Sequence, residues 1–501
     1  MTAATRKHQP AYGNWVRPRS AGIGPLGMAS TGALLLGVVL ALLVSMIFSG
    51  VAALVTAAVF AVPIVLASVP VSGRSLGAAL VIRVGWWRRR GRRAHQYRTG
   101  MLSNLPSGRG RPLPGVLAST RLLEVIDGYD RSVGVIHRPG QHHYTVVLRC
   151  LADGAGLVEP EIVDTWVAGY GGFLAALGQE PGLRSASVIV DTAPDTGTWL
   201  ASEHERTLAA DAPELARAVM AEVVERYPAA GSENTIYVAL TYAGSGLHRK
   251  PRDSRAVMTE LARRLPGLIG ALEQAGAGTV EPVAAAELPA LIRVAFDPGA
   301  HQQLSAAAAA GAPVDLGWSE AGPVAAEESW SAYRHDGATS VTWEMLEAPR
   351  GTVFFDVLAA LLAPHPDFVR KRVALLYRPH DPAAAATITQ RDANAVTFPA
   401  RNPGGRVSAM AERNVEATKQ SEHEIAAGAG LTRFALMVTA TVTSAEDLPQ
   451  AIATIDRLGR ISRLSLRRSY GSQAAAFALT LPAGFVPWEH ALIPPTVREF
   501  L

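Results

Sequence analysis

The sequence predicts a helical membrane hairpin followed by cytoplasmic α/β (α+β) domains that have mixed sheets flanked by helices. The hairpin is indicated by a stretch from Ser20 to Gly73, 54 positions, that contains no Asp, Glu, Lys, Arg or His. The globular part is indicated by short β-branched runs that alternate with longer segments of helical periodicity, which is typical of sheets covered by helices.

The uncharged stretch is too long for one crossing of a hydrocarbon core about 30 Å thick, which needs about 20 residues. It accommodates two helices, which we expect at Met28–Phe48 and Val51–Val69, with Ser49 and Gly50 at the turn. Two helices joined so closely run antiparallel. The sequence therefore predicts that both ends of the hairpin lie on the same side of a cell membrane.

The distribution of charge predicts which side that is. Residues 1–100 carry twelve Lys and Arg and no acidic residue, so the net charge of +4 leaves −8 for residues 101–501. Basic flanks favour a cytoplasmic position for both termini. A secretory signal peptide is the alternative interpretation of this N-terminal apolar stretch, but the apolar region of a signal peptide is much shorter than the stretch found here. Because the basic charge belongs to the first 100 residues, no direct nucleic-acid partner is expected. The one cysteine, Cys150, excludes an intramolecular disulfide.

A short apolar run, Ser75 to Trp87, follows the hairpin and is too short to cross a bilayer. We expect an interfacial helix here, with a collar of two tryptophans and five arginines against lipid headgroups, because indole and guanidinium groups favour that layer. A contact with nucleic acid is the alternative interpretation of the arginines. The collar consists of Trp86, Trp87, Arg88, Arg89, Arg90, Arg92 and Arg93.

Composition divides the chain into four parts. Residues 1–100 form the basic tail, hairpin and collar; 101–300 a first cytoplasmic domain; 301–328 an Ala- and Gly-rich linker; and 329–501 a second cytoplasmic domain. Periodicity predicts strands and helices in both domains. The expected strands include 133–136, 144–148, 186–190, 235–242, 369–377, 434–442 and 462–466. The expected helices include 161–177, 213–227, 254–274, 286–296, 407–427, 446–458 and 472–481.

Patterns that carry chemistry are weak. The phosphate-loop pattern is absent, and Ala243–Lys250 (AGSGLHRK) has its glycines two apart with no hydroxyl after Lys250, so a turn is expected. His142 and His143 are adjacent in a hairpin that also holds His137, and neighbouring strand residues point to opposite faces, which disfavours a metal site. Gly317–Ala321 (GWSEA) lacks the second glycine of a nucleophile elbow. We therefore expect no enzyme activity, no cofactor and no metal.

The run from His423 to Phe485 combines a strand, a helix, a second strand and a last helix. That helix has a Gly-x-Gln start and a Leu-Pro-x-Gly end, carried by Gly471, Gln473, Phe477, Leu481, Pro482 and Gly484. This order resembles the N-terminal, pre-motor domain of the large assembly ATPases of type IV secretion systems, and the helix 286–296 looks like that domain's first half. The hairpin is similar to the PrgI-like membrane subunit of the same machines. Actinobacterial conjugation-like integral membrane proteins share this layout.

The resemblance implies a non-catalytic inner-membrane scaffold of a type IV secretion or conjugation-like apparatus. Its partners would be lipids, a separate motor ATPase and other subunits, with self-association left open. No Walker lysine follows the Leu-Pro-x-Gly segment, so ATP hydrolysis is not implied. The alternatives are a membrane subunit of a type VII-like secretion system, and a membrane-anchored enzyme.

Overall fold

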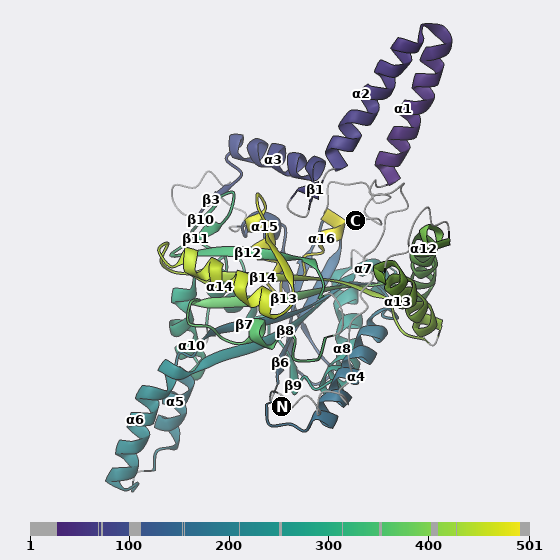
Figure 1. The fold of residues 1–501 in the computed structure, drawn as a ribbon. Coiled ribbons are helices and arrows are strands. Elements are labelled where there is room, and N and C mark those ends of the chain that lie inside the picture. Colours follow the sequence, from purple (N-terminus) through teal and green to yellow (C-terminus); the bar gives the residue numbers. More distant parts are fainter. Residues whose placement is uncertain are drawn as a thin grey trace. The chain divides into compact units, whose positions relative to one another are not determined.

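The computed structural model describes residues 28–68, 70–71, 74–99, 112–152, 154, 156–209, 211–249, 253–312, 314–349, 353–401, 409–426 and 428–490 (Figure 1). They belong to two compact units. The first includes His95–Pro382 and Ala429–Val486; the second includes the described residues before His95, the segment Ala383–Gly428 and the residues from Pro487. The basic tail predicted for residues 1–20 lies outside the described residues.

A 13-stranded sheet dominates the first unit. Eleven of its strands form a path in the order β3-β10-β11-β12-β14-β13-β7-β8-β6-β5-β4, while β15 pairs with β12 and β9 with β6. The strands are β3 (Gln96–Arg98), β4 (Arg121–Ile126), β5 (Ser132–Arg138), β6 (His143–Leu151), β7 (Leu183–Pro194), β8 (Ser232–Ala243), β9 (Thr279–Pro282), β10 (Ala325–Glu328), β11 (Tyr333–His335), β12 (Ala338–Glu347), β13 (Arg370–Pro379), β14 (Thr432–Val442) and β15 (Ser465–Arg468).

The sheet is built twice from the same succession of elements. In the first half, β4, β5 and β6 lead through a helix to β7, a pair of helices leads to β8, and a helix, β9 and a last helix follow. In the second half, β10, β11 and β12 lead to β13, β14 and β15 in the same way. The pairings repeat too, because β6 pairs with β5, β8 and β9 as β12 pairs with β11, β14 and β15.

The two halves meet where β7 and β13 pair antiparallel. Lys371–Tyr377 lies opposite Ala186–Thr192, with Ile189 facing Ala374 at the centre. Topologically equivalent strands therefore lie side by side in opposite directions. This arrangement relates the two halves by an approximate two-fold rotation and makes one continuous sheet of them.

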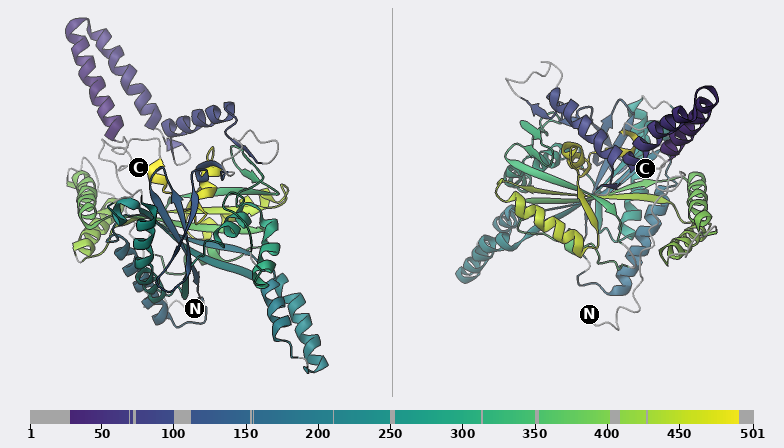
Figure 2. Two further views of the ribbon diagram at one scale, coloured as in Figure 1. Left: turned by 180° about the vertical axis from the view of Figure 1, so that it is seen from behind. Right: turned by 45° about the horizontal axis from the view of Figure 1, so that its top comes forward.

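Helices cover both faces of the sheet (Figure 2). On one face, α4 and α8 bury side chains such as Val238 and Leu240, and α14 buries side chains such as Val438. On the other face, α9 and α15 pack on a cluster that includes Ile189 and Ala374. These helices are α4 (Pro160–Leu177), α8 (Ser254–Gln274), α9 (Leu288–Phe296), α14 (Leu448–Ile461) and α15 (Gln473–Leu479).

Shorter helices complete this unit: η2 (Gly115–Leu117), α7 (Gly244–Leu247), η3 (Pro298–Ala300), α10 (His301–Ala309) and α11 (Ala359–Leu362). Between β7 and β8 the chain forms a hairpin of α5 (Thr198–Thr207) and α6 (Glu214–Ala230), which extends away from the sheet in both figures.

The second unit is mainly helical. It contains α1 (Met28–Ile47), α2 (Gly50–Ser68), β1 (Pro70–Val71), β2 (Arg74–Ser75), α3 (Leu76–Gly91), α12 (Pro382–Arg401), α13 (Ala409–Ala426) and α16 (Pro487–His490). Helices α1 and α2 contact each other along an antiparallel hairpin. Gly37 has no room for a side chain there, since an added Cβ would lie 2.5 Å from the Phe60 Cβ.

The helical hairpin is confirmed, but the prediction that it spans a membrane is wrong. Within the described residues, none of the helices has the length and apolar character that a membrane crossing requires. A span needs about 20 strongly apolar residues in one helix. The absence of charge over 54 positions is a weaker property, because Thr31, Ser45 and Thr56 are polar and a turn divides the stretch. The predicted membrane location, two-pass topology and cytoplasmic placement of both termini are withdrawn with it.

The predicted mixed sheet is also wrong, because every pairing among the described strands is antiparallel. The segment between β7 and β8 contains two helices, so the chain returns to the strand it left and can pair antiparallel with it. Most predicted elements are confirmed, with α8 matching its predicted bounds. The expected linker 301–328 contains α10 and β10. The four-part division of the chain stays a prediction.

The buried face of α8 should be a main determinant of stability. Leu265 is fully buried there, so Leu265→Ala should reduce the free energy of unfolding by about 2–5 kcal/mol through lost burial and a cavity. Leu215→Ala on exposed α6 is the control, with an expected change within about 0.5 kcal/mol. Denaturant titration measures both. Equal destabilisation by the two variants would contradict this assignment of the core.

Candidate functional site: a buried polar layer under α15

The structure gathers the six motif residues around α15, beginning with Gln473. Its side chain is fully buried and forms hydrogen bonds with the backbone of Thr342 in β12. The Gln473 Oε1 accepts the Thr342 N–H at 2.8 Å, and Nε2 donates to the Thr342 carbonyl at 3.2 Å. On this side of β12, strand β11 ends its pairing at Ser340 and β15 begins at Trp343. The Thr342 carbonyl also accepts the Ser469 N–H at 2.9 Å, so the amide of Gln473 mainly supplies the acceptor that the Thr342 N–H lacks from a strand.

Two motif glycines shape the chain on either side of α15. Gly471 has φ 72° and donates its N–H to the Trp330 carbonyl at 2.8 Å. Gly484 has φ 65°, and a Cβ built on it would lie 1.9 Å from Thr145 Oγ1. A positive φ and the absence of space both require glycine at position 484. This glycine lets the chain after α15 pass directly over β6.

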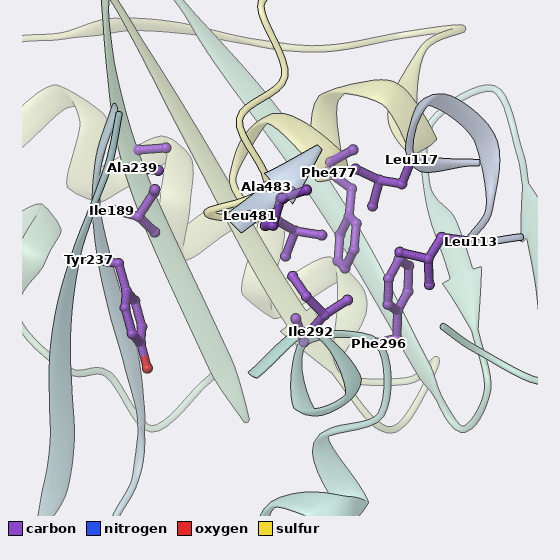
Figure 3. Close-up of a cluster of buried hydrophobic side chains, with 14 of the residues drawn as sticks. Leu113, Leu117, Ile189, Tyr237, Ala239, Ile292, Phe296, Phe477, Leu481 and Ala483 are labelled. Carbon is purple, nitrogen blue, oxygen red and sulfur yellow. The ribbon is translucent and has the colours of Figure 1, made fainter. Parts of the chain in front are cut away.

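The apolar motif residues pack between α15 and the sheet. Phe477 is fully buried, and its ring centroid lies 5.1 Å from that of Phe296 and 4.8 Å from that of His335. Figure 3 shows Phe477 among Leu117, Leu481 and Phe296. Leu481 and Pro482 are buried as well. These contacts join α15 to α9 and so connect the two halves of the sheet on this face.

Hydroxyl groups line the sheet beneath this helix. Thr342 Oγ1 lies 2.8 Å from Thr439 Oγ1, which lies 3.0 Å from Thr480 Oγ1. Thr480 in turn donates to the Phe477 carbonyl at 2.8 Å. The first half repeats the motif, because Thr145 and Thr241 face each other with their hydroxyl oxygens 2.9 Å apart. Neighbouring strands are thus linked by side chains as well as by backbone.

A buried histidine and serine stand beside these hydroxyls. The His335 Nε2 lies 2.8 Å from Ser340 Oγ, and its Nδ1 contacts the Phe296 carbonyl oxygen. Because a carbonyl only accepts, Nδ1 carries the proton and Nε2 accepts from Ser340. Burial lowers the pKa of His335 to about 4, and the charge of Arg372 acts in the same direction. The imidazole is therefore neutral near pH 7.

This pair has the donor–acceptor order of a nucleophile and its base, but its setting points to a structural role. Both side chains are 0% exposed, so a substrate cannot reach the Ser340 hydroxyl without displacing the helix above it. An imidazole with a pKa of about 4 is also a weak base. We interpret the pair as a satisfied polar contact within the core.

Three consecutive cations begin β13. Arg370 donates to both carboxylate oxygens of Asp191, with distances of 2.8, 2.8 and 3.1 Å, so this buried pair is bidentate. Lys371 points to the opposite face, where it donates to the Ala363 carbonyl, and burial lowers its pKa to about 8. Arg372 is 1% exposed and lies over the Phe477 ring at 4.7 Å.

Sequence reasoning found the motif residues but missed the polar layer beneath them. The run Arg370-Lys371-Arg372 at the start of a predicted strand was the available signal for this layer. Successive side chains of a strand point to opposite faces, so three consecutive cations in a strand that is buried on both faces place charges on each side of the sheet. The threonines gave no such signal, because threonine is common in strands for its β-branched shape alone.

The collar residues occupy the end of α3 and the turn after it, in the second unit. Trp86 is buried and Trp87 exposed, and the Arg89 guanidinium lies 5.7 Å from the Trp86 ring centroid. Arg93 adopts φ 55°. The predicted helix is confirmed. Lipid contact by Arg88, Arg90, Arg92 and the rest of the collar stays untested.

The weaker patterns have packing roles. His137 stacks on Tyr144 with centroids 4.4 Å apart, and the described residues contain no group of three side chains suited to a metal ion. In the Gly-rich turn, an added Cβ on Gly246 would lie 2.2 Å from the Gly182 Cα. Close backbone approach thus explains this glycine, and Lys250 lies outside the described residues.

Comparison with protein families gives a match over part of the chain. A family described as a domain of unknown function, DUF8461, matches residues 19–78. This region covers α1, α2 and the start of α3. No curated protein matches the chain.

The Gln473 contact should contribute measurably to stability. Gln473→Leu would leave the Thr342 N–H without its Gln473 acceptor in the core, so the free energy of unfolding should fall by about 1–3 kcal/mol. Chemical denaturation measures it. Gln420→Leu on the exposed surface of α13 is the control and should change little. Equal stability of Gln473→Leu and wild type would show that the amide is dispensable.

The neutral His335 should make the fold sensitive to acid. Its pKa is about 4 when folded against 6.5 unfolded, so the unfolded state binds an extra proton between these values. Stability should fall by about 3 kcal/mol as pH drops from 6.5 to 4. His335→Gln should flatten the curve, whereas His204→Gln on α5 should not. Parallel curves for wild type and His335→Gln, from denaturant titrations across this range, would refute the assignment.

Proposed function

We propose that the chain is a non-catalytic scaffold component of a type IV secretion or conjugation-like apparatus, and that it docks a separate motor ATPase. The observation that carries the docking role is the α5–α6 hairpin. An apolar stripe on α6 is left uncovered by the described residues, and an uncovered stripe of this kind is a feature of protein-binding surfaces.

The stripe consists of residues four apart on one helix. Leu215 is 77% exposed, Val219 50% and Val223 40%, while Val224 on the other side of the helix is half-buried. Residues at this spacing share one face of a helix. Trp199 on α5 adds a further exposed ring at 70%. This geometry suits the apolar face of a partner helix.

The scaffold role is supported by the positions of the motif residues. Gln473, Phe477 and Gly484 hold α15 on a sheet, and each contributes hydrogen bonding, packing or backbone freedom instead of a reachable reactive group. A continuous antiparallel sheet covered on both faces gives a stiff base for the projecting hairpin. The resemblance of these residues to the pre-motor domain of assembly ATPases suggests the class of apparatus.

The test is binding between the full chain and a motor ATPase encoded beside its gene. Wild type should co-purify with the ATPase and bind it in calorimetry. Val219→Glu should weaken binding at least tenfold, because it places a charge in the apolar contact at a cost above about 1.4 kcal/mol. Ala221→Glu, exposed on the opposite side of α6, is the matched control and should bind as wild type does.

Two results would count against the proposal. Equal binding by Val219→Glu and Ala221→Glu would move the docking surface away from the α6 stripe. Failure of wild type to bind any such ATPase would remove the docking role itself. Circular dichroism of each variant checks that α6 remains folded.

A further inference from the structure

The strongest unexplained feature is the guanidinium of Arg372. It is 1% exposed, and neither Nη1 nor Nη2 has a hydrogen-bond partner within the described residues. Its Nε lies 3.4 Å from Thr480 Oγ1, a long contact. A buried charge whose donors are unsatisfied costs several kcal/mol, so such groups are rare.

The nearby carboxylate of Asp191 does not accept a hydrogen bond from Nη1 or Nη2 of Arg372. Asp191 lies opposite Arg372 in the sheet, but Arg370 already binds both of its oxygens. Glu233 also interacts with Arg370, but it is not among the charges that act on Arg372. The Arg372 guanidinium is thus left without a hydrogen-bonded carboxylate. Burial lowers the pKa of Arg372 to about 10, with the Asp191 charge opposing this shift and the Arg370 charge adding to it, so the group is still charged near neutral pH.

The hydroxyl groups around Arg372 already form hydrogen bonds with other groups. Thr480 donates to the Phe477 carbonyl, and Thr439 contacts both Thr342 and Thr480. The Phe477 ring covers one face of the guanidinium. The site therefore offers the two Nη nitrogens and the positive charge of the Arg372 guanidinium, while the neighbouring hydroxyls already bond to other groups.

We propose that Arg372 binds a monatomic anion, chloride under cellular conditions, at Nη1 and Nη2 in the core beneath α15. A halide accepts hydrogen bonds from both nitrogens and balances the charge of the guanidinium. A water molecule would satisfy hydrogen bonds but leave the charge. An oxyanion would add oxygens that each need a donor, and the surrounding hydroxyls are already engaged with one another and with the Phe477 carbonyl.

The site would link anion concentration to the stability of the fold. Arg372 lies under Phe477 and beside Thr480, so the anion would help to hold α15 on the sheet. A ligand that binds only the folded state stabilises it in proportion to the logarithm of its concentration above the dissociation constant. This inference does not depend on docking by the α5–α6 hairpin.

Crystals of the full chain grown or soaked in sodium bromide provide the direct test. An anomalous peak within hydrogen-bonding distance of Nη1 and Nη2 of Arg372 is expected. Ordered water without anomalous signal, or a side chain of this protein in that place, would overturn the proposal.

Unfolding in solution provides the second test. At fixed ionic strength, replacing sodium gluconate by sodium chloride should lower the unfolding equilibrium constant of the wild type about tenfold per tenfold rise in chloride above the dissociation constant. Arg372→Met should remove this dependence. Arg334→Met, which removes an exposed cation from β11, is the matched control and should retain it.

An identical response to chloride in wild type and Arg372→Met would place the effect elsewhere and refute the site. The same holds if chloride and gluconate act alike on the wild type. If Arg372→Met does not fold, the bromide crystals and the comparison of salts on the wild type decide the question.

Discussion

The pairing of β7 with β13 is the contact on which the rest of the first unit depends. Each half of the sheet ends at one of these strands, and the ladder from Ala186–Thr192 to Lys371–Tyr377 joins them. An isolated half would expose the edge of a long central strand, which is a template for uncontrolled pairing. The second half supplies the matching edge, so each half protects the other.

This central pairing also explains why charged groups lie so deep. Asp191 and Arg370 occupy neighbouring strands at the junction, and their side chains form a bidentate pair in the core. A buried pair of this kind contributes little net stability, but it disfavours any register that separates the two charges. Together with the hydroxyl contacts of Thr342 and Thr439, it favours one alignment of the strands.

The same layer explains how the motif residues at the end of the chain act. Gln473 takes a backbone-like position at a gap in the ladder, and Gly484 permits a close crossing over Thr145. Phe477 then covers the guanidinium of Arg372. Gln473 contacts a strand of the second half and Gly484 a strand of the first half. The segment around α15 therefore helps to hold both halves of the sheet together.

The sequence by itself determined most of the local structure. Periodicity located α8, β8 and β14, because a buried helix face and a pleated strand each impose a regular spacing of apolar residues. The glycines and Gln473 were recognisable as a motif. The stretch 20–73 predicted a helical hairpin correctly but not its relation to a membrane, because freedom from charge does not measure the apolar length of a helix.

Only the tertiary structure decided the direction of the strands, the duplication of the sheet and the buried polar layer. Helices between strands predict parallel and antiparallel neighbours equally well until the path of the connection is known. Arg370 and Arg372 are buried because helices cover the sheet on both faces. Such burial is set by contacts between segments that are distant along the chain.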